Sequence, residues 1–148
     1  MNTDTFIKQK KTPPGTVPGY LNITENTLPS KIALYSYNSD GFKEDFIENV
    51  EELKVKIDLS SETVYWIKVQ GLGTKSTLEF IANEFAIHKL HLEDIINVYQ
   101  RPKMEEAREN LFITSRMFSL KNHGILNDEQ LSVFLKSNLL ISFQENYN

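Results

Sequence analysis

Short stretches of the chain alternate apolar with polar residues, or run β-branched and aromatic residues together, between turn-forming residues. Both patterns are typical of β-strands, half-buried in the first case and fully buried in the second. We predict strands at 31–37, 64–69, 103–108, 111–118, 130–135 and 139–143. The last two are joined only by Lys136-Ser137-Asn138, which predicts an antiparallel hairpin.

Apolar residues three or four positions apart, which share one face of a helix, predict helices at 42–53 and from Ser76 onward. Ser76 and Glu79 have the spacing of a capping box, in which each side chain accepts a hydrogen bond from the other's backbone amide. The buried stripe of this second helix is predicted to be Leu78, Ile81, Ala82 and Phe85.

A third helix is predicted within residues 88–103, after a short break near His88. Its buried face is expected to be Leu92, Ile95, Ile96 and Tyr99. Glu93 and Asp94 then lie on the opposite, exposed flank. Because proline disfavours the helical conformation in the residue before it, Arg101 should mark where the chain straightens ahead of Pro102.

Strands mixed with helices and followed by consecutive strands predict an α/β fold. We expect a mixed β-sheet flanked by helices, an α/β/α sandwich, ending in the C-terminal antiparallel hairpin. Residues 1–19, with lysines followed by prolines and glycines and no regular period, predict an extended N-terminal arm. Residues 20–148 should then form one α/β domain, with a connecting loop at 119–128.

Composition narrows the function without identifying it. The 148 residues carry a net charge of −4, which gives no electrostatic reason to bind nucleic acid and suits cations better. There is no cysteine, so disulfides, thiolate zinc sites and cysteine nucleophiles are excluded. No serine or threonine stands beside a histidine and an acid in a recognisable catalytic order, and we expect no enzyme activity. No apolar stretch approaches the ~20 residues that cross a bilayer, so the polypeptide as it stands is expected to be soluble.

The segment Gly71-Leu72-Gly73-Thr74-Lys75-Ser76-Thr77, between a predicted strand and a predicted helix, has the composition of a phosphate-binding loop. Its spacing differs from that of a Walker loop, which needs a glycine where Ser76 stands and a lysine directly after that glycine, whereas Lys75 comes before Ser76. An ordinary turn from strand to helix is therefore favoured over nucleotide binding.

Two overlapping groups of residues could bind metal. His88, His91 and Asp94 lie at successive i+3 steps, so a continuous helix would bring them onto one flank as a zinc or other transition-metal site. The break near His88 favours ordinary helix-start and surface histidines instead. Glu93 and Asp94 are either solvated acids near a helix start or oxygen ligands for a hard cation such as Mg²⁺.

The third helix and its exit carry a family resemblance. The sequence His88-x-Leu90-x-Leu92-Glu93-Asp94-Ile95-x-Asn97-x-x-Gln100-Arg101-Pro102-Lys103-x-Glu105 closely resembles the signature of the CorA family of magnesium and cobalt channels, in their cytoplasmic N-terminal domain. Other pieces follow in the family's order: Pro13-Pro14-Gly15-Thr16, Trp66, Leu111-Phe112-Ile113, Glu129-Gln130-Leu131-Ser132 and Ile141-Ser142-Phe143-Gln144-Glu145. The resemblance spans about residues 12 to 145.

This resemblance implies a cation-sensing regulatory domain at the cytoplasmic face of the inner membrane, in a homopentamer built around a helical stalk. Asp94 matches the family position whose carboxylate binds a divalent cation, Mg²⁺ or Co²⁺, between adjacent subunits, with a partner acid on the stalk helix. Glu93 matches a neighbouring acid of a second, weaker site. The bound ions hold the ring symmetric and the pore closed.

The sequence also departs from the family. The stalk, the two membrane helices and the Gly-Met-Asn loop are missing, so we expect an excised fragment that reaches the membrane through a missing C-terminal segment. Lys89 and His91 stand where the family commonly has proline and an aliphatic residue. Two alternatives stay open: the same domain of a zinc-transporting relative, suggested by His88 and His91, and a free-standing soluble module that binds a protein partner or nucleotide.

Overall fold

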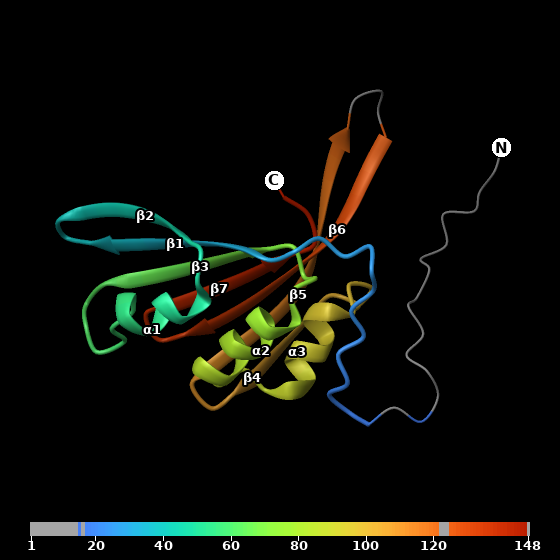
Figure 1. Cartoon of the computed structure of the whole chain (residues 1–148), viewed down its shortest axis with the longest axis horizontal. Coiled ribbons are helices and arrows are strands. Elements are labelled where there is room, and N and C mark those ends of the chain that lie inside the picture. The colour runs from blue at the N-terminus through green and yellow to red at the C-terminus, as the bar shows by residue number, and fades with distance from the viewer. Residues whose placement is uncertain (1–14, 16, 122–124, 148) are drawn as a thin grey trace.

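A seven-stranded sheet organises the part of the chain that the computed structural model describes, which is residues 15, 17–121 and 125–147. The strand order is β2-β1-β3-β7-β6-β5-β4 (Figure 1). The strands are β1 (Lys31–Asn38), β2 (Gly41–Ile47), β3 (Val64–Gln70), β4 (Lys103–Ala107), β5 (Asn110–Lys121), β6 (Ile125–Lys136) and β7 (Leu139–Gln144). All of the predicted strands are confirmed, with ends that differ by a few residues.

The sheet is mixed because β3 and β7 run parallel at its centre, whereas the other neighbouring strands are antiparallel. Tyr65 lies opposite Leu139 in this parallel pair, which joins the early strands to the late ones. The turn between β6 and β7 confirms the predicted hairpin, and Ser137 adopts a φ of 45° there. The predicted α/β class with a mixed sheet is confirmed.

The helices of the described residues lie on one face of this sheet in Figure 1, so these residues form two layers and the second helical layer of the predicted α/β/α sandwich is not found among them. The helices are the 3₁₀ turn η1 (Val50–Glu52), α1 (Leu53–Lys56), α2 (Lys75–Glu84) and α3 (Lys89–Ile96). Between helices and sheet lies one hydrophobic core, whose fully buried members include Leu53, Ile67, Leu78, Ile81, Ile95 and Ile141. The core therefore fixes where α3 sits relative to the sheet edge.

The predicted helix at 42–53 is wrong in its first half. Residues 41–47 form β2, which pairs with β1 across a turn in which the Asn38 side chain accepts hydrogen bonds from the amides of Asp40 and Gly41. Ile47 points into the core while Phe46, one residue earlier, is exposed. The same apolar residues fit a strand or a helix, and pairing with β1 selects the strand. Helical structure begins only after Asn49, whose side chain caps η1.

The predicted capping box at Ser76 and Glu79 is also wrong. Helix α2 begins at Lys75, with Thr74 as its N-cap residue and no side-chain cap hydrogen bond. The Thr74 hydroxyl instead accepts a hydrogen bond from the amide of Ser30, at 2.9 Å. A contact 44 residues away in sequence has thus replaced the local cap. The predicted buried stripe of Leu78, Ile81, Ala82 and Phe85 is confirmed.

Strands β5 and β6 extend into the segment predicted as a loop at 119–128. They stay in register as far as the pair of Lys121 with Ile125, and form an arm that projects beyond the rest of the sheet in Figure 1. The loop prediction was therefore wrong over most of its length. Asn122, His123 and Gly124, the residues that suggested a loop, lie outside the described residues.

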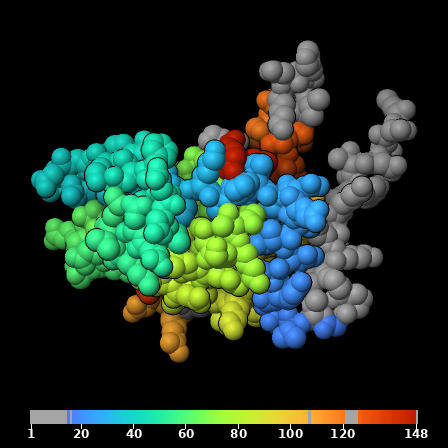
Figure 2. Space-filling model, viewed as in Figure 1, coloured from blue at the N-terminus to red at the C-terminus, as the bar shows by residue number. Residues whose placement is uncertain are grey.

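Most of the predicted N-terminal arm at 1–19 lies outside the described residues. The stretch 17–30, which contains no helix or strand, lies against the surface of α2 and α3 (Figure 2). The boundary between arm and domain stays a prediction. In the described part of the chain, no helix is both long and apolar enough to cross a bilayer.

Candidate metal centre

Helix α3 is held at both ends by local hydrogen bonds. His88 is its N-cap residue, and the imidazole Nδ1 accepts a hydrogen bond from the amide of Leu90 at 3.2 Å. The helix ends at Ile96, well before Pro102, so it is shorter than predicted. Leu92, Ile95 and Ile96 are buried as predicted, and Tyr99, beyond the helix, packs against the core half-buried.

Asp94 occupies the flank of α3 that faces β4. Its Oδ2 lies 2.7 Å from the Nζ of Lys103, and its side chain is 18% exposed. The backbone carbonyl of Asp94 accepts a hydrogen bond from Nε2 of Gln130 on β6, at 2.9 Å. Asp94, which was predicted to be exposed, is therefore partly buried and ion-paired. The hydrogen bond from Gln130 fixes its turn of α3 to the sheet.

The ion pair extends into a row of four side chains that we call the α3–β4 network: Asp94, Lys103, Glu105 and His91. Lys103 Nζ also donates to Glu105 Oε1 at 3.1 Å, and Glu105 Oε2 lies 3.1 Å from His91 Nε2. Burial lowers the pKa of Lys103, but hydrogen bonds to Asp94 and Glu105 outweigh it and raise that pKa above its usual value. The hydrogen bond from Lys103 in turn lowers the pKa of Glu105.

His91 lies at the far end of this network, with its ring stacked on Phe112 at a centroid distance of 4.3 Å. Its Nδ1 is buried and has no hydrogen-bond partner among the described residues. The ring of His88 is 6.0 Å away and meets His91 edge-on. Because His88 Nδ1 already accepts the Leu90 amide as the helix cap, that nitrogen is not free to bind a metal ion beside His91.

The α3–β4 network lines an open cavity of about 300 Å³, together with His88, Leu90 and Glu93. In the described residues, no group of three or more histidine, cysteine or acidic side chains is arranged to hold a metal ion. The structure therefore does not assemble the predicted cluster of His88, His91 and Asp94. The carboxylate of Asp94 is a hard oxygen donor that suits Mg²⁺, but it fits only part of a coordination shell.

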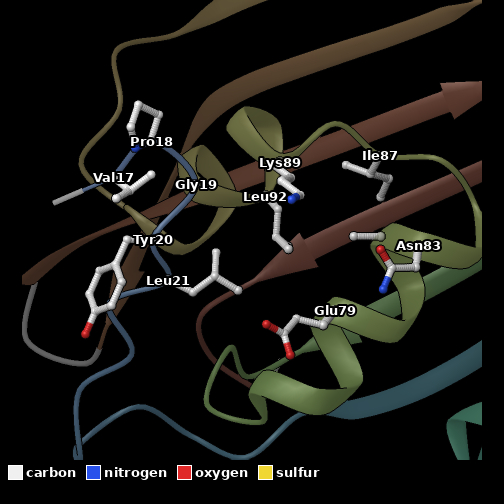
Figure 3. Close-up of a pocket in the computed structure, with 11 residues that line it drawn as sticks. Val17, Pro18, Gly19, Tyr20, Leu21, Glu79, Asn83, Ile87, Lys89 and Leu92 are labelled. Carbon is white, nitrogen blue, oxygen red and sulfur yellow. The ribbon is translucent and has the colours of Figure 1, made fainter.

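Glu93 has a different partner from its neighbour Asp94. Its Oε2 accepts a hydrogen bond from the amide of Gly19 at 2.8 Å, which ties the N-terminal stretch to α3. Val17, Gly19 and Leu21 line one side of a pocket of about 460 Å³, whose other side is formed by α2 and α3 (Figure 3). The two candidate ligand residues therefore line one cavity but have different hydrogen-bond partners.

The glycines between β3 and α2 allow another segment of backbone to approach closely. A Cβ atom on Gly71, which has a φ of +79°, would lie 2.1 Å from the carbonyl oxygen of Pro29. A Cβ on Gly73 would lie 2.5 Å from that of Thr27, and the Gly73 amide donates to the carbonyl of Leu28 at 2.7 Å. Residues 27–29 fill the space beside this loop, which supports the ordinary turn over a phosphate cradle.

The hydrophobic and polar pattern of the sequence does not predict a functional role for three residues of the site, Lys103, Glu105 and Gln130. All three stand in the stretches that carry the family resemblance, which was the available signal. Lys103 is 9 positions from Asp94 in the sequence, and Gln130 is 36 positions from it. No helical or strand period links positions that far apart.

Comparison with known proteins identifies relatives in sequence. The family model described as CorA-like Mg²⁺ transporter protein matches residues 61–148. The cobalt/magnesium transport protein CorA of Thermotoga maritima is 35% identical over 138 residues, which are 93% of this chain and 38% of that protein. The chain thus spans less than two-fifths of the length of the curated relative it matches.

Solved structures share the fold at low sequence identity. The full-length CmaX protein has a TM-score of 0.63 and 16% identity, over 80% of this chain and 36% of its own. The complete CorA magnesium transporter from Methanocaldococcus jannaschii has a TM-score of 0.54 and 16% identity, over 75% of this chain and 31% of its own. The soluble domain of CorA from the same organism has a TM-score of 0.53 and 15% identity, over 78% of this chain and 41% of its own.

Proposed function

The chain belongs to the family of CorA-like Mg²⁺ transporter proteins, and from this premise we propose that it is the divalent-cation-sensing domain of a CorA-type magnesium and cobalt channel. The match over residues 61–148, which contains the whole of α3 and β4, is the observation that carries the proposal. In the complete protein the domain faces the cytoplasm beside the inner membrane. It regulates the pore and catalyses no reaction.

The proposed ligand is a divalent cation, Mg²⁺ or Co²⁺, held by Asp94 at the boundary between two subunits of a homopentamer. Asp94 supplies one carboxylate, and the stalk helix of the neighbouring subunit supplies another. Two facing carboxylates repel each other at short range, and a cation between them reverses that interaction. Because the ion bridges subunits only when they are close together, its binding favours the closed ring.

The arrangement of the α3–β4 network supports this role for Asp94. The carboxylate borders an open cavity and lies on a helix turn that Gln130 ties to the sheet. A single chain offers too few acidic donors in its described residues to enclose an ion. A ligand set completed by a second subunit, and by the waters that Mg²⁺ usually keeps, is consistent with that geometry.

Glu93 is the proposed residue of a second, weaker cation site. Its carboxylate borders the same cavity as Asp94 but already accepts the Gly19 amide. A cation bound there shares the carboxylate with the N-terminal stretch. That this site is the weaker one follows from the family position that Glu93 matches.

The proposal is tested by recording current from the complete channel with Asp94→Ala. A partly exposed ion pair contributes at most about 1 kcal/mol, so the variant should fold. We expect cytoplasmic Mg²⁺ to inhibit its current much less than that of the unaltered channel. Asp40→Ala, which removes an exposed acid from the turn before β2, serves as the control and should keep normal inhibition. Equal Mg²⁺ inhibition in both variants would remove Asp94 from the sensing site.

A second candidate is the equivalent domain of a zinc-transporting relative, favoured by His88 and His91 at the same cavity. Imidazole nitrogens are ligands that Zn²⁺ prefers and Mg²⁺ does not. Flux of Zn²⁺ and Mg²⁺ through the complete protein separates the two candidates. A channel that carries Zn²⁺ and excludes Mg²⁺ supports the second.

A further inference from the structure

Lys103 is the residue that covers the proposed ligand oxygen. Its Nζ lies 2.7 Å from Asp94 Oδ2 and 3.1 Å from Glu105 Oε1, so one ammonium group bridges two carboxylates. Its side chain is 31% exposed, with the charged end at the cavity that Asp94 borders. The ammonium therefore holds a place in which a metal ion would also be stable.

An ammonium and a divalent cation cannot both contact Asp94 without repelling each other. Two charges of the same sign a few ångströms apart interact unfavourably, and partial burial strengthens the effect because water screens it less. A lysine side chain is nevertheless flexible, since its charge sits at the end of a four-carbon stem. The ammonium can turn away from Asp94 without movement of the backbone.

Glu105 offers the displaced ammonium a second partner. It is placed beside Lys103 on the same face of β4 and is itself held by His91 Nε2 at 3.1 Å. Lys103 can therefore release Asp94 and stay paired. In that arrangement Glu105 and His91 position the Lys103 side chain.

We propose that Lys103 is a tethered competitor of the divalent cation, which neutralises Asp94 when no ion is bound and must move toward Glu105 for the ion to bind. This inference rests on the proposed function, since it takes Asp94 to be a cation ligand. Lys103 then lowers the affinity of the site, so that only a high concentration of the cation occupies it.

The test uses Mn²⁺ as a paramagnetic probe for the 148-residue chain. Bound Mn²⁺ broadens the NMR signals of nearby amides, and the amide of Asp94 reports occupancy even when binding is weak. Lys103→Met keeps the length and apolar character of the stem and removes the charge. We expect it to reach equal broadening at a Mn²⁺ concentration roughly tenfold lower than the unaltered chain.

Lys75→Met is the matched control, because it removes the same charge from an ion pair with Glu79 on α2. It should leave the Mn²⁺ dependence at Asp94 unchanged. Lys103→Arg, which keeps the charge, should resemble the unaltered chain. If Lys103→Met fails to fold, Lys103→Gln takes its place with the same expected direction.

Asp94→Asn in the Lys103→Met background separates this inference from the proposed function. Glu93→Gln is added to each variant so that the second proposed site does not contribute, and broadening at α3 that then persists without Asp94 contradicts the proposed cation site itself. Broadening that needs Asp94 but has the same Mn²⁺ dependence with and without the Lys103 charge overturns the competitor role alone. Absence of broadening at α3 in Lys103→Met also overturns it, because the uncovered carboxylate should bind.

Discussion

At the scale of single residues, Glu105 connects the two halves of the α3–β4 network. One carboxylate oxygen accepts from Lys103 and the other meets His91. The Lys103 hydrogen bond lowers the pKa of Glu105 in the folded protein. The unfolded chain therefore takes up a proton at this carboxyl more readily than the folded one.

This pKa difference predicts how acid affects stability. A carboxyl whose pKa is lowered by folding stabilises the fold above its unfolded pKa, about 4.3 for glutamate, and that contribution is lost as the pH falls through the folded pKa. We expect Glu105→Gln to lose less stability than the unaltered chain on acidification from neutral pH. Urea unfolding at a series of pH values measures the difference.

Glu106→Gln is the control for this prediction, because Glu106 is the next residue along β4 and points to the opposite face of the strand. It should follow the unaltered chain more closely than Glu105→Gln does. A Glu105→Gln variant with the same loss of stability in acid as the unaltered chain would contradict the role assigned to the Lys103 contact.

Part of the site could be predicted from residues alone. The apolar period placed Leu92, Ile95 and Ile96 in the core, and the resemblance singled out Glu93 and Asp94. The spacing did not predict that Lys103 would cover Asp94, because that contact joins a helix to a strand across Pro102. The partial burial of Asp94 follows from the same tertiary contact, which no local pattern encodes.

At the scale of elements, Glu93 fastens the N-terminal stretch to α3. The carboxylate accepts the Gly19 amide at 2.8 Å, and a Cβ on Gly19, which has a φ of +89°, would lie 3.3 Å from Cβ of Lys89. The backbone thus passes close to the helix at a residue without a side chain. A charged acceptor makes this a stronger hydrogen bond than one between neutral groups.

We expect Glu93→Ala to release this contact. Exchange of the Gly19 amide with deuterium should become roughly tenfold faster, because a hydrogen bond to a charged group contributes about 1.5–3 kcal/mol. Glu79→Ala, which removes an acid from the pocket that Gly19 lines, is the control and should leave that exchange unchanged. Unaltered exchange in Glu93→Ala would show that the stretch is held by its apolar contacts.

The elements themselves were predictable to different degrees. Strand β3 and helix α3 were found because local preference and tertiary burial agree at Val64–Gln70 and Lys89–Ile96. The sequence predicts a helix at β2 because the spacing of its apolar residues fits a helix as well as a strand. Hydrogen-bonded pairing with β1 selects the strand. The start of α2 was misplaced for a similar reason, since Thr74 bonds to Ser30 instead of capping locally.

At the scale of the whole molecule, the order of elements was enough to predict the class but not the strand order. The parallel pair of β3 with β7 brings together residues more than 70 positions apart, such as Tyr65 and Leu139. This pairing sets the antiparallel strands β6, β5 and β4 on one side of β7, with α3 above them. Asp94 consequently lies near the sheet edge formed by β4, which is where the proposed neighbouring subunit would have to approach.

The proposed role of Asp94 is to bind a divalent cation shared between subunits. The most direct test is anomalous diffraction from crystals of the complete protein grown with Co²⁺. We expect an anomalous peak within coordination distance of the Asp94 carboxylate and of an acid on the neighbouring subunit, with Lys103 Nζ turned toward Glu105. Co²⁺ bound elsewhere in the protein, with Lys103 still paired to Asp94 and no peak between the subunits at this residue, would contradict the account.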